Sequence, residues 1–359
     1  MKIKTWLLSA LLIGLNSLFM APPFAFTQED KLTKLLSTEI ADFWQTGQFS
    51  SFQGIDNTRI NYASFIAEKP NNCLVITPGR SESYIKYQEL AFDLAKLNIN
   101  IFIIDHRGQG LSERLLDNPH KGYVKQFDDY TDDLHTFINT LVKPQCATNQ
   151  QPLLLAHSMG GAIATRLIQK YPNAVKATLL ASPMIAINKG GLPEWLAISL
   201  ITSGNFLNQL INDQAWYFIG QGDYQAKDFA SNNLMHSQIR YQKFIDLYQA
   251  QPELQLGGVT FNWLKQAVLT QQKIFAELDK ISSPITIMQA GNDTIVDNSA
   301  QDNFCHQLNQ LKPSLCQQSK PFVIEGAKHE LLFESDEYRD QALTFIENWI
   351  FKNTDLSRD

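Results

Sequence analysis

The sequence predicts an α/β fold in which helices cover both faces of a mostly parallel sheet and a helical insertion forms a cap over it. Short apolar runs of strand length alternate with helical patterns along most of the chain, which is typical of parallel strands buried on both faces. Of the 359 residues, 44% are hydrophobic and 18% are charged, the composition of a globular protein. Between about residues 182 and 278 the alternation stops and no clear buried strand occurs, so we expect the insertion there.

A short helix and a hairpin are expected before the parallel strands begin. Residues 30–45 have a short helical pattern, and residues 49–66 read as a hairpin that turns at 54–57. Buried strands are then predicted at residues 73–77, 101–104, 153–156, 177–181, 285–289 and 321–324. Helical patterns follow at 87–97, at 127–141, directly after residue 158, and around 342–349. Because the insertion lies between strands of one sheet, we assign residues 27–181 and 279–359 to the core and residues 182–278 to the cap.

Residues 1–26 have the pattern of an export signal, either a signal peptide or a membrane anchor. Lys2 and Lys4 precede an apolar run from residue 6 to residue 20, and small residues and prolines follow it. A cut after Ala25 would leave Pro23 at an unfavourable position of the cleavage site, whereas the uncut segment would be about long enough to span a bilayer. We therefore expect export and leave cleavage open.

Net charge and short motifs argue against several classes of function. The formal net charge of -6, without a basic stripe, argues against a nucleic-acid partner. Gly108 and Gly110 follow a predicted strand, but Glu113 occupies the third glycine position of a dinucleotide-binding fingerprint, so we expect no nucleotide site. The cysteines lack the spacing of a zinc site. The sequence thus indicates neither a cofactor nor a metal.

Ser158 lies where an apolar strand ends and a helix begins, as a nucleophile does at the elbow of a serine hydrolase. Gly160 follows two residues later, and Ala156 stands two residues before, where a glycine is usual. Small residues are needed because a bulky side chain would collide with the backbone of so tight a turn. The start of the helix also favours the negative charge that develops during acyl transfer. A serine that only caps a helix would look similar, so its partners must decide.

The partners are predicted at the carboxyl ends of two later strands. Asp293 follows the strand at 285–289, and His329 follows the strand at 321–324. His329 would take the proton of the serine, and Asp293 would orient the imidazole and stabilise its cation. The order serine, acid, histidine is the one used by hydrolases of this type. Asp297 is a competing acid that reads better as a helix N-cap, and Glu325 is a weaker third choice.

An oxyanion hole is expected from two backbone N–H groups. Met159, directly after the serine, supplies one. The second should come from the loop after the strand at 73–77, and we choose Arg80, because Gly79 before it lets the backbone approach closely. A simple Pro-Gly turn would explain the same residues.

The four cysteines form an even set, and an oxidising compartment would permit disulfides. Cys73 and Cys146 are expected at the amino ends of neighbouring strands, and Cys305 and Cys316 at the two ends of a helix-to-strand connection. We predict the pairs Cys73–Cys146 and Cys305–Cys316. Four unpaired thiols remain the alternative.

With these residues in place, the chain resembles the α/β-hydrolase superfamily and, within it, the monoacylglycerol-lipase-like serine hydrolases. Residues 105–112 are similar to the Asp-x-x-Gly-x-Gly-x-Ser segment of that group. The bacterial lysophospholipase branch is closer still, through cap residues 233–237, 240–241, 254–260 and 263 and through residues 296–298 and 326–330. The likeness spans roughly residues 43–351, with departures at Ala156 and at Pro78, where relatives often carry histidine.

The resemblance implies a serine esterase that cleaves the acyl ester of lysophospholipids, a single-chain lipid substrate, through an acyl-enzyme on Ser158. It also implies membrane association, which with the export signal places the enzyme in the periplasm or at the inner membrane. A monoacylglycerol lipase or a general carboxylesterase is the alternative. A binding protein of the same fold is a further alternative, although such a protein would be expected to lack one of the three catalytic residues.

Overall fold

The computed structural model describes residues 25–68, 72–147, 150–188, 193–211 and 214–356. The expected export segment, residues 1–26, lies almost wholly outside the described residues. Among the described helices, none is both long enough and apolar enough to cross a membrane.

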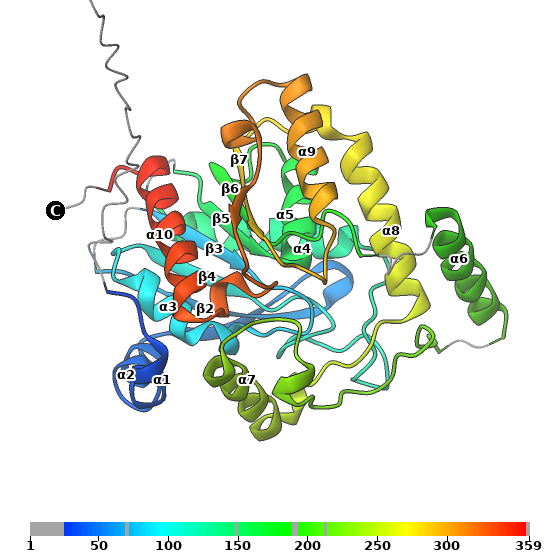
Figure 1. The fold of residues 1–359 in the computed structure, drawn as a ribbon, viewed down its shortest axis with the longest axis horizontal. Coiled ribbons are helices and arrows are strands. Elements are labelled where there is room, and N and C mark those ends of the chain that lie inside the picture. The colour runs from blue at the N-terminus through cyan, green and yellow to red at the C-terminus, as the bar shows by residue number, and fades with distance from the viewer. Residues whose placement is uncertain (1–24, 69–71, 148–149, 189–192, 212–213, 357–359) are drawn as a thin grey trace, which may run out of the picture.

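Eight strands form one sheet in the order β1-β2-β4-β3-β5-β6-β7-β8 (Figure 1). They are β1 Gln48–Gln53, β2 Arg59–Phe65, β3 Cys73–Thr77, β4 Asn100–Ile104, β5 Leu153–His157, β6 Ala177–Ala181, β7 Ile285–Ala290 and β8 Phe322–Ile324. The six strands from β3 to β8 run parallel, and the hairpin β1–β2 adds an antiparallel edge next to β4. The expected mostly parallel sheet is confirmed.

Strand β3 lies between β4 and β5, because β4 is added on one side of β3 and β5 on the other. The order of the strands therefore changes direction at β3. Ligands of open parallel sheets bind beyond the carboxyl ends of the strands at such a point. Thr77, the last residue of β3, pairs with Ala156 of β5. The loop after β3 and the loop after β5 therefore lie side by side, which places Gly79 and Arg80 next to Ser158.

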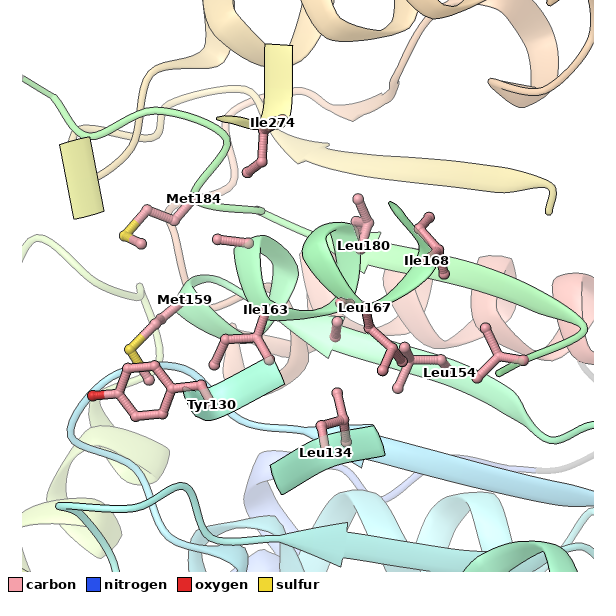
Figure 2. Close-up of a cluster of buried hydrophobic side chains, with 14 of the residues drawn as sticks. Tyr130, Leu134, Leu154, Met159, Ile163, Leu167, Ile168, Leu180, Met184 and Ile274 are labelled. Atoms are coloured by element: carbon pink, nitrogen blue, oxygen red, sulfur yellow. The ribbon is translucent and has the colours of Figure 1, made fainter. Parts of the chain in front are cut away.

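The described α-helices are α1 Glu29–Leu35, α2 Glu39–Gln45, α3 Gln88–Ala95, α4 Asp128–Phe137, α5 Met159–Lys170, α6 Glu194–Ile211, α7 Gln238–Ala250, α8 Phe261–Ala276, α9 Asn298–Leu311 and α10 Asp336–Asn353. Side chains of α4, α5, α8 and α9 share one buried apolar cluster on one face of the sheet, and those of α3 and α10 share a second on the other (Figure 1). In the first cluster Ile163 and Leu167 of α5 lie between the sheet and α4 (Figure 2).

The segment from residue 182 to residue 278 is helical as expected, but its last helix belongs to the core. Trp263, Ala267 and Ile274 of α8 are buried in the same cluster as α5, and the Gln169 side chain donates to the Ile274 carbonyl. Helices α6 and α7 lie outside the layer of α4, α5, α8 and α9 (Figure 1), but Tyr241 and Ile245 of α7 are buried in the second cluster with α3 and α10. Helix α8 therefore joins the two parts, since Trp263, Ala267 and Ile274 pack on the core and Phe261 lies against Gly204 of α6.

Candidate active site

Ser158 adopts a backbone conformation that side chains rarely accept, with φ 53° and ψ -117°. The conformation is held by close packing around it. A Cβ on Gly160 would lie 2.3 Å from the Thr77 carbonyl oxygen, and one on Gly161 would lie 2.5 Å from Pro183. Ala156 is fully buried within β5 and is accommodated there, so the turn does not need a glycine at that position. The sharp turn presents the Ser158 hydroxyl at the carboxyl edge of the sheet.

Ser158, His329 and Asp293 form a hydrogen-bonded chain. His329 Nε2 lies 2.8 Å from Ser158 Oγ, and His329 Nδ1 lies 2.7 Å from Asp293 Oδ2. The Asp293 side chain is fully buried, which alone would raise its pKa, but the hydrogen bond and charge of His329 lower the pKa below its usual value, helped by the N–H groups of Ile295 and Val296. A carboxylate that stays ionised can orient the imidazole and stabilise its cation.

The competing acids Asp297 and Glu325, and a further buried histidine, His106, lie elsewhere or have other partners. The Asp297 side chain accepts from the Ala300 N–H and caps α9, as predicted, and Glu325 is exposed. His106 pairs with the Thr77 hydroxyl at 2.7 Å, and burial lowers the pKa of His106 to about 3, so its imidazole is neutral. None of the three lies in the chain of hydrogen bonds to Ser158.

The loop after β3 lies against the serine. A Cβ on Gly79 would lie 3.1 Å from Ser158 Cβ and 3.0 Å from Glu82, so any side chain there would force these neighbours to shift. Within the described residues, the backbone N–H groups of Arg80 and Met159 donate to no acceptor. Two free N–H groups beside the serine are what an oxyanion hole requires.

A buried group of charges beneath this loop was not foreseen from the sequence. Glu82 accepts from the Gly79 N–H at 2.5 Å and from the Tyr87 hydroxyl at 2.7 Å. Lys86 bonds to Glu82 and lies 2.8 Å from Glu330. The Glu82 carboxylate therefore fixes the glycine that precedes the predicted oxyanion donor. A lone glutamate three residues after a glycine carries no sign of this role, because its partners come from distant segments.

His157 completes this group of charges from the side of the serine. Its Nδ1 lies 3.3 Å from Glu82, and its Nε2 lies 3.4 Å from the His329 carbonyl oxygen. Burial alone would lower the pKa of His157, but the charges of Glu82 and Glu330 raise it above the usual value. Glu82, Glu330 and His157 are close enough to share a metal ion, but the Lys86 ammonium already bonds both carboxylates.

The segment at 105–112 supports the same loop from below. Asp105 accepts from the Tyr84 N–H at 2.5 Å and from the Leu111 N–H at 2.7 Å. Gly110, at φ 56°, lies so close that a Cβ would be 2.1 Å from the Asp105 carboxylate. The Gln109 amide in turn donates to the Gly79 carbonyl. Gly110 therefore serves a turn that braces the loop bearing Gly79 and Arg80, the predicted oxyanion loop.

The four cysteines lie in the expected pairs. The Cα atoms of Cys73 and Cys146 are 5.6 Å apart, and those of Cys305 and Cys316 are 5.3 Å apart, both within the range of a disulfide.

Comparison with known proteins finds a matching family and several relatives. A family described as serine aminopeptidase, S33, matches residues 68–336. Lysophospholipase L2 of Escherichia coli is 37% identical over 320 residues, covering 89% of this chain and 92% of that protein. A probable lysophospholipase L2 of Haemophilus influenzae is 30% identical over 87% of this chain and 95% of its own length.

More distant relatives have the same fold. Monoglyceride lipase of Rattus norvegicus is 25% identical over 78% of this chain and 82% of its own length. The crystal structure of a monoglyceride lipase from Saccharomyces cerevisiae superimposes with a TM-score of 0.64 at 16% identity, covering 86% of this chain and 95% of that one. The chain therefore belongs to the serine aminopeptidase S33 family of α/β-hydrolases, in the group that contains the lysophospholipases L2, and it is a serine ester hydrolase.

Proposed function

We propose that this enzyme is a lysophospholipase that cleaves the carboxylic ester of its substrate through an acyl-enzyme on Ser158. The hydrogen-bonded chain from Ser158 through His329 to Asp293 is the observation that carries the proposal. Relatives at 37% and 30% identity that bear the name lysophospholipase L2 support the choice of substrate.

The geometry gives each residue a task. His329 Nε2 takes the proton of Ser158 as the oxygen attacks the ester carbonyl, and Asp293 stabilises the imidazolium that forms. The N–H groups of Met159 and Arg80 bind the oxyanion. The imidazolium then protonates the departing alcohol, which leaves the acyl group on Ser158. A water molecule, deprotonated by the same histidine, releases the fatty acid and restores the serine.

A monoacylglycerol lipase is the second candidate, and the similarity to monoglyceride lipases favours it. Both substrates contain one long acyl chain on a small polar alcohol. The higher identity to the lysophospholipases L2, 37% against 25%, favours the phospholipid.

We also propose that the protein is exported and works at a membrane surface, in the periplasm or at the inner membrane. The pattern of residues 1–26 supports export. Helix α6 supports the membrane surface, because several of its large apolar side chains are exposed, namely Trp195, Leu196, Leu200, Phe206, Leu207, Leu210 and Ile211.

Labelling with a fluorophosphonate probe, followed by a panel of lipid esters, tests the proposed function. Ser158 should be labelled in the wild-type protein and the label should be absent from Ser158→Ala. Specificity, as kcat/KM, should rise from short to long single-chain esters, since each buried CH₂ contributes about 0.8 kcal/mol. Turnover of two-chain phospholipids should be poor. A preference for acetyl esters, or equal turnover of diacyl lipids, would show that the protein is a general esterase and not a lysophospholipase. A wild-type protein that is not labelled would indicate a binding protein.

A further inference from the structure

The Arg80 side chain lies in an unusual setting for a partly buried cation. Its Nη1 donates to the Gly257 carbonyl at 2.9 Å, and its guanidinium lies 5.9 Å from the centre of the Trp263 ring. Among the described residues, no carboxylate lies within 4 Å of this guanidinium, whereas Arg107, Arg166, Arg240 and Arg339 each pair with at least one. Most N–H groups of the Arg80 guanidinium are therefore free to bind a group that is not part of the chain.

The same guanidinium borders a polar cavity of about 430 Å³ that opens between the oxyanion loop and the cap. Tyr224, which also lines it, has a buried hydroxyl without a hydrogen-bond partner among the described residues. Its ring stacks on Tyr248, whose hydroxyl donates to the Ser81 carbonyl at 2.6 Å. Tyr224 is thus held at the loop that bears Arg80. Two unsatisfied donors on one cavity call for an acceptor-rich ligand.

The charges around the cavity favour an anion. Lys227 lines it as a second cation, exposed and without an ion pair among the described residues. The one carboxylate of the lining, Asp223, already accepts from the Tyr217 hydroxyl at 2.5 Å and from the Asn118 amide at 2.9 Å. Both bonds end on Asp223 Oδ1, and among the described residues no hydrogen bond or ion pair joins Asp223 to Arg80 or to the Tyr224 hydroxyl, so these donors remain available to a ligand.

The position of Arg80 relates this cavity to the scissile ester. Its backbone N–H is the predicted second donor of the oxyanion hole. About six bonds separate this nitrogen from the guanidinium carbon, and about six separate the ester carbonyl carbon from phosphorus in a lysophospholipid acylated at its terminal glycerol carbon. An arginine fork also matches the oxygens of a phosphate better than a neutral hydroxyl. We propose that Arg80 and Tyr224 form a subsite for the phosphodiester group of the substrate, so that one residue serves the oxyanion through its backbone and the head group through its side chain.

This inference rests on the proposed function, and a matched pair of substrates tests it. Specificity, again as kcat/KM, is measured for oleoyl lysophosphatidylcholine and for monooleoylglycerol in the same neutral detergent micelles, and the first value is divided by the second. Arg80→Met, which keeps the backbone N–H, should lower this ratio by about 10- to 100-fold, as expected for losing charge-assisted hydrogen bonds. Tyr224→Phe should lower it by about threefold or more, and since its hydroxyl has no partner within the described residues, the variant should fold normally.

Arg114→Met is the matched control. Arg114 is also partly buried, but its guanidinium donates to the carbonyls of Gly110, Pro119 and Glu253 and does not line the cavity. The substrate ratio should be unchanged in this variant. An unchanged ratio in Arg80→Met and Tyr224→Phe, or a fall of equal size in Arg114→Met, would overturn the phosphate subsite.

A binding measurement separates the head group from free phosphate. Glycerophosphocholine, the product without its acyl chain, should inhibit the wild-type enzyme and lose at least tenfold in affinity against Arg80→Met. Inorganic phosphate should inhibit far less; equal inhibition by phosphate would overturn the head-group assignment in favour of a general anion site. If the wild-type enzyme cleaved neither ester, the proposed function itself would fail, which differs from cleavage of both with an unchanged ratio.

Discussion

Asp293 and Asp297 are four residues apart, yet their carboxylates accept from different groups. Asp293 accepts from His329 at 2.7 Å, whereas Asp297 accepts from the N–H of Ala300 at the start of α9. Only Asp293 is therefore part of the hydrogen-bonded chain to Ser158.

Replacing a residue of this chain should reduce catalysis severely. Ser158→Ala or His329→Ala should lower kcat by about 10⁴-fold or more, leaving what binding and the oxyanion hole provide. Asp293→Asn should cost on the order of 10³- to 10⁴-fold, because the imidazole is left in the wrong tautomer and its cation loses its partner. Steady-state kinetics on a long-chain ester measures these losses.

Asp297→Asn is the matched control for that series, since asparagine caps a helix as well as aspartate does. Its kcat should stay within about threefold of the wild-type value. A larger loss in Asp297→Asn than in Asp293→Asn would show that the acid has been assigned to the wrong residue.

His157 gives the stability of the protein a definite dependence on pH. The charges of Glu82 and Glu330 raise its pKa above the usual value near 6.5, so the native state holds a proton that the unfolded chain has already released. This contribution is fully present below about pH 6.5 and is lost as the pH rises through the native pKa. The free energy of unfolding of the wild type should therefore fall relative to that of His157→Gln between pH 6 and pH 9.

Urea unfolding of both proteins at several pH values measures that difference. Each unit of pKa shift corresponds to about 1.4 kcal/mol. A difference that stayed constant, or that grew with pH, would show that the His157 imidazole is neutral in the native protein.

At the scale of elements, the strands were predictable and the roles of buried polar residues were not. Every parallel strand was located to within a residue or two, because strands buried on both faces are almost continuously apolar. The positions of Ser158, Asp293 and His329 followed from the ends of those strands. Glu82 and Tyr224 could not be found in this way, since their surroundings are built from segments far away in the sequence. Helix α8 was assigned to the cap because a helical stripe does not reveal which neighbour it packs against.

The cysteine pairs connect elements and should form disulfides. Cys73 at the start of β3 and Cys146 before β5 close a loop with a sequence separation of 73 residues, and Cys305 and Cys316 close one of 11. In the chain-entropy account, longer loops stabilise more, about 4 kcal/mol for the first pair and about 3 for the second. Replacing both cysteines of a pair by alanine should therefore cost more stability for Cys73 and Cys146 than for Cys305 and Cys316.

Peptide mapping under non-reducing conditions shows whether these bonds exist. We expect two cross-linked peptides, one for each pair, in protein produced in an oxidising compartment. Free thiols or crossed pairs would contradict the assignment, and equal stability of both double variants would contradict the chain-entropy account.

At the scale of the whole molecule, α6 exposes more large apolar side chains than the surface of a soluble protein ordinarily does. It lies at the outside of the molecule, away from the sheet and from α7 (Figure 1). Trp195, Leu210 and Ile211 are 70%, 66% and 69% exposed, which is far above what burial in a core would leave. Within the helix only Glu194 is charged, so attraction to anionic lipid cannot come from α6 itself. A membrane surface would cover this face through apolar contacts alone.

Replacing Trp195, Leu210 and Ile211 together by serine should therefore weaken binding to phospholipid vesicles by at least tenfold, since each large apolar side chain contributes about 1.5–3 kcal/mol when fully buried. Vesicle co-sedimentation measures the partition coefficient, and Leu311→Ser, which removes a 57% exposed side chain from α9 on the core, is the matched control. Activity on a soluble short-chain ester should be kept, because these side chains lie outside the hydrogen-bonded chain to Ser158. The binding should also change little between low and high salt, as apolar contacts are not screened. Binding that vanished at high salt, or that fell equally in Leu311→Ser, would show that the protein meets lipid through another surface.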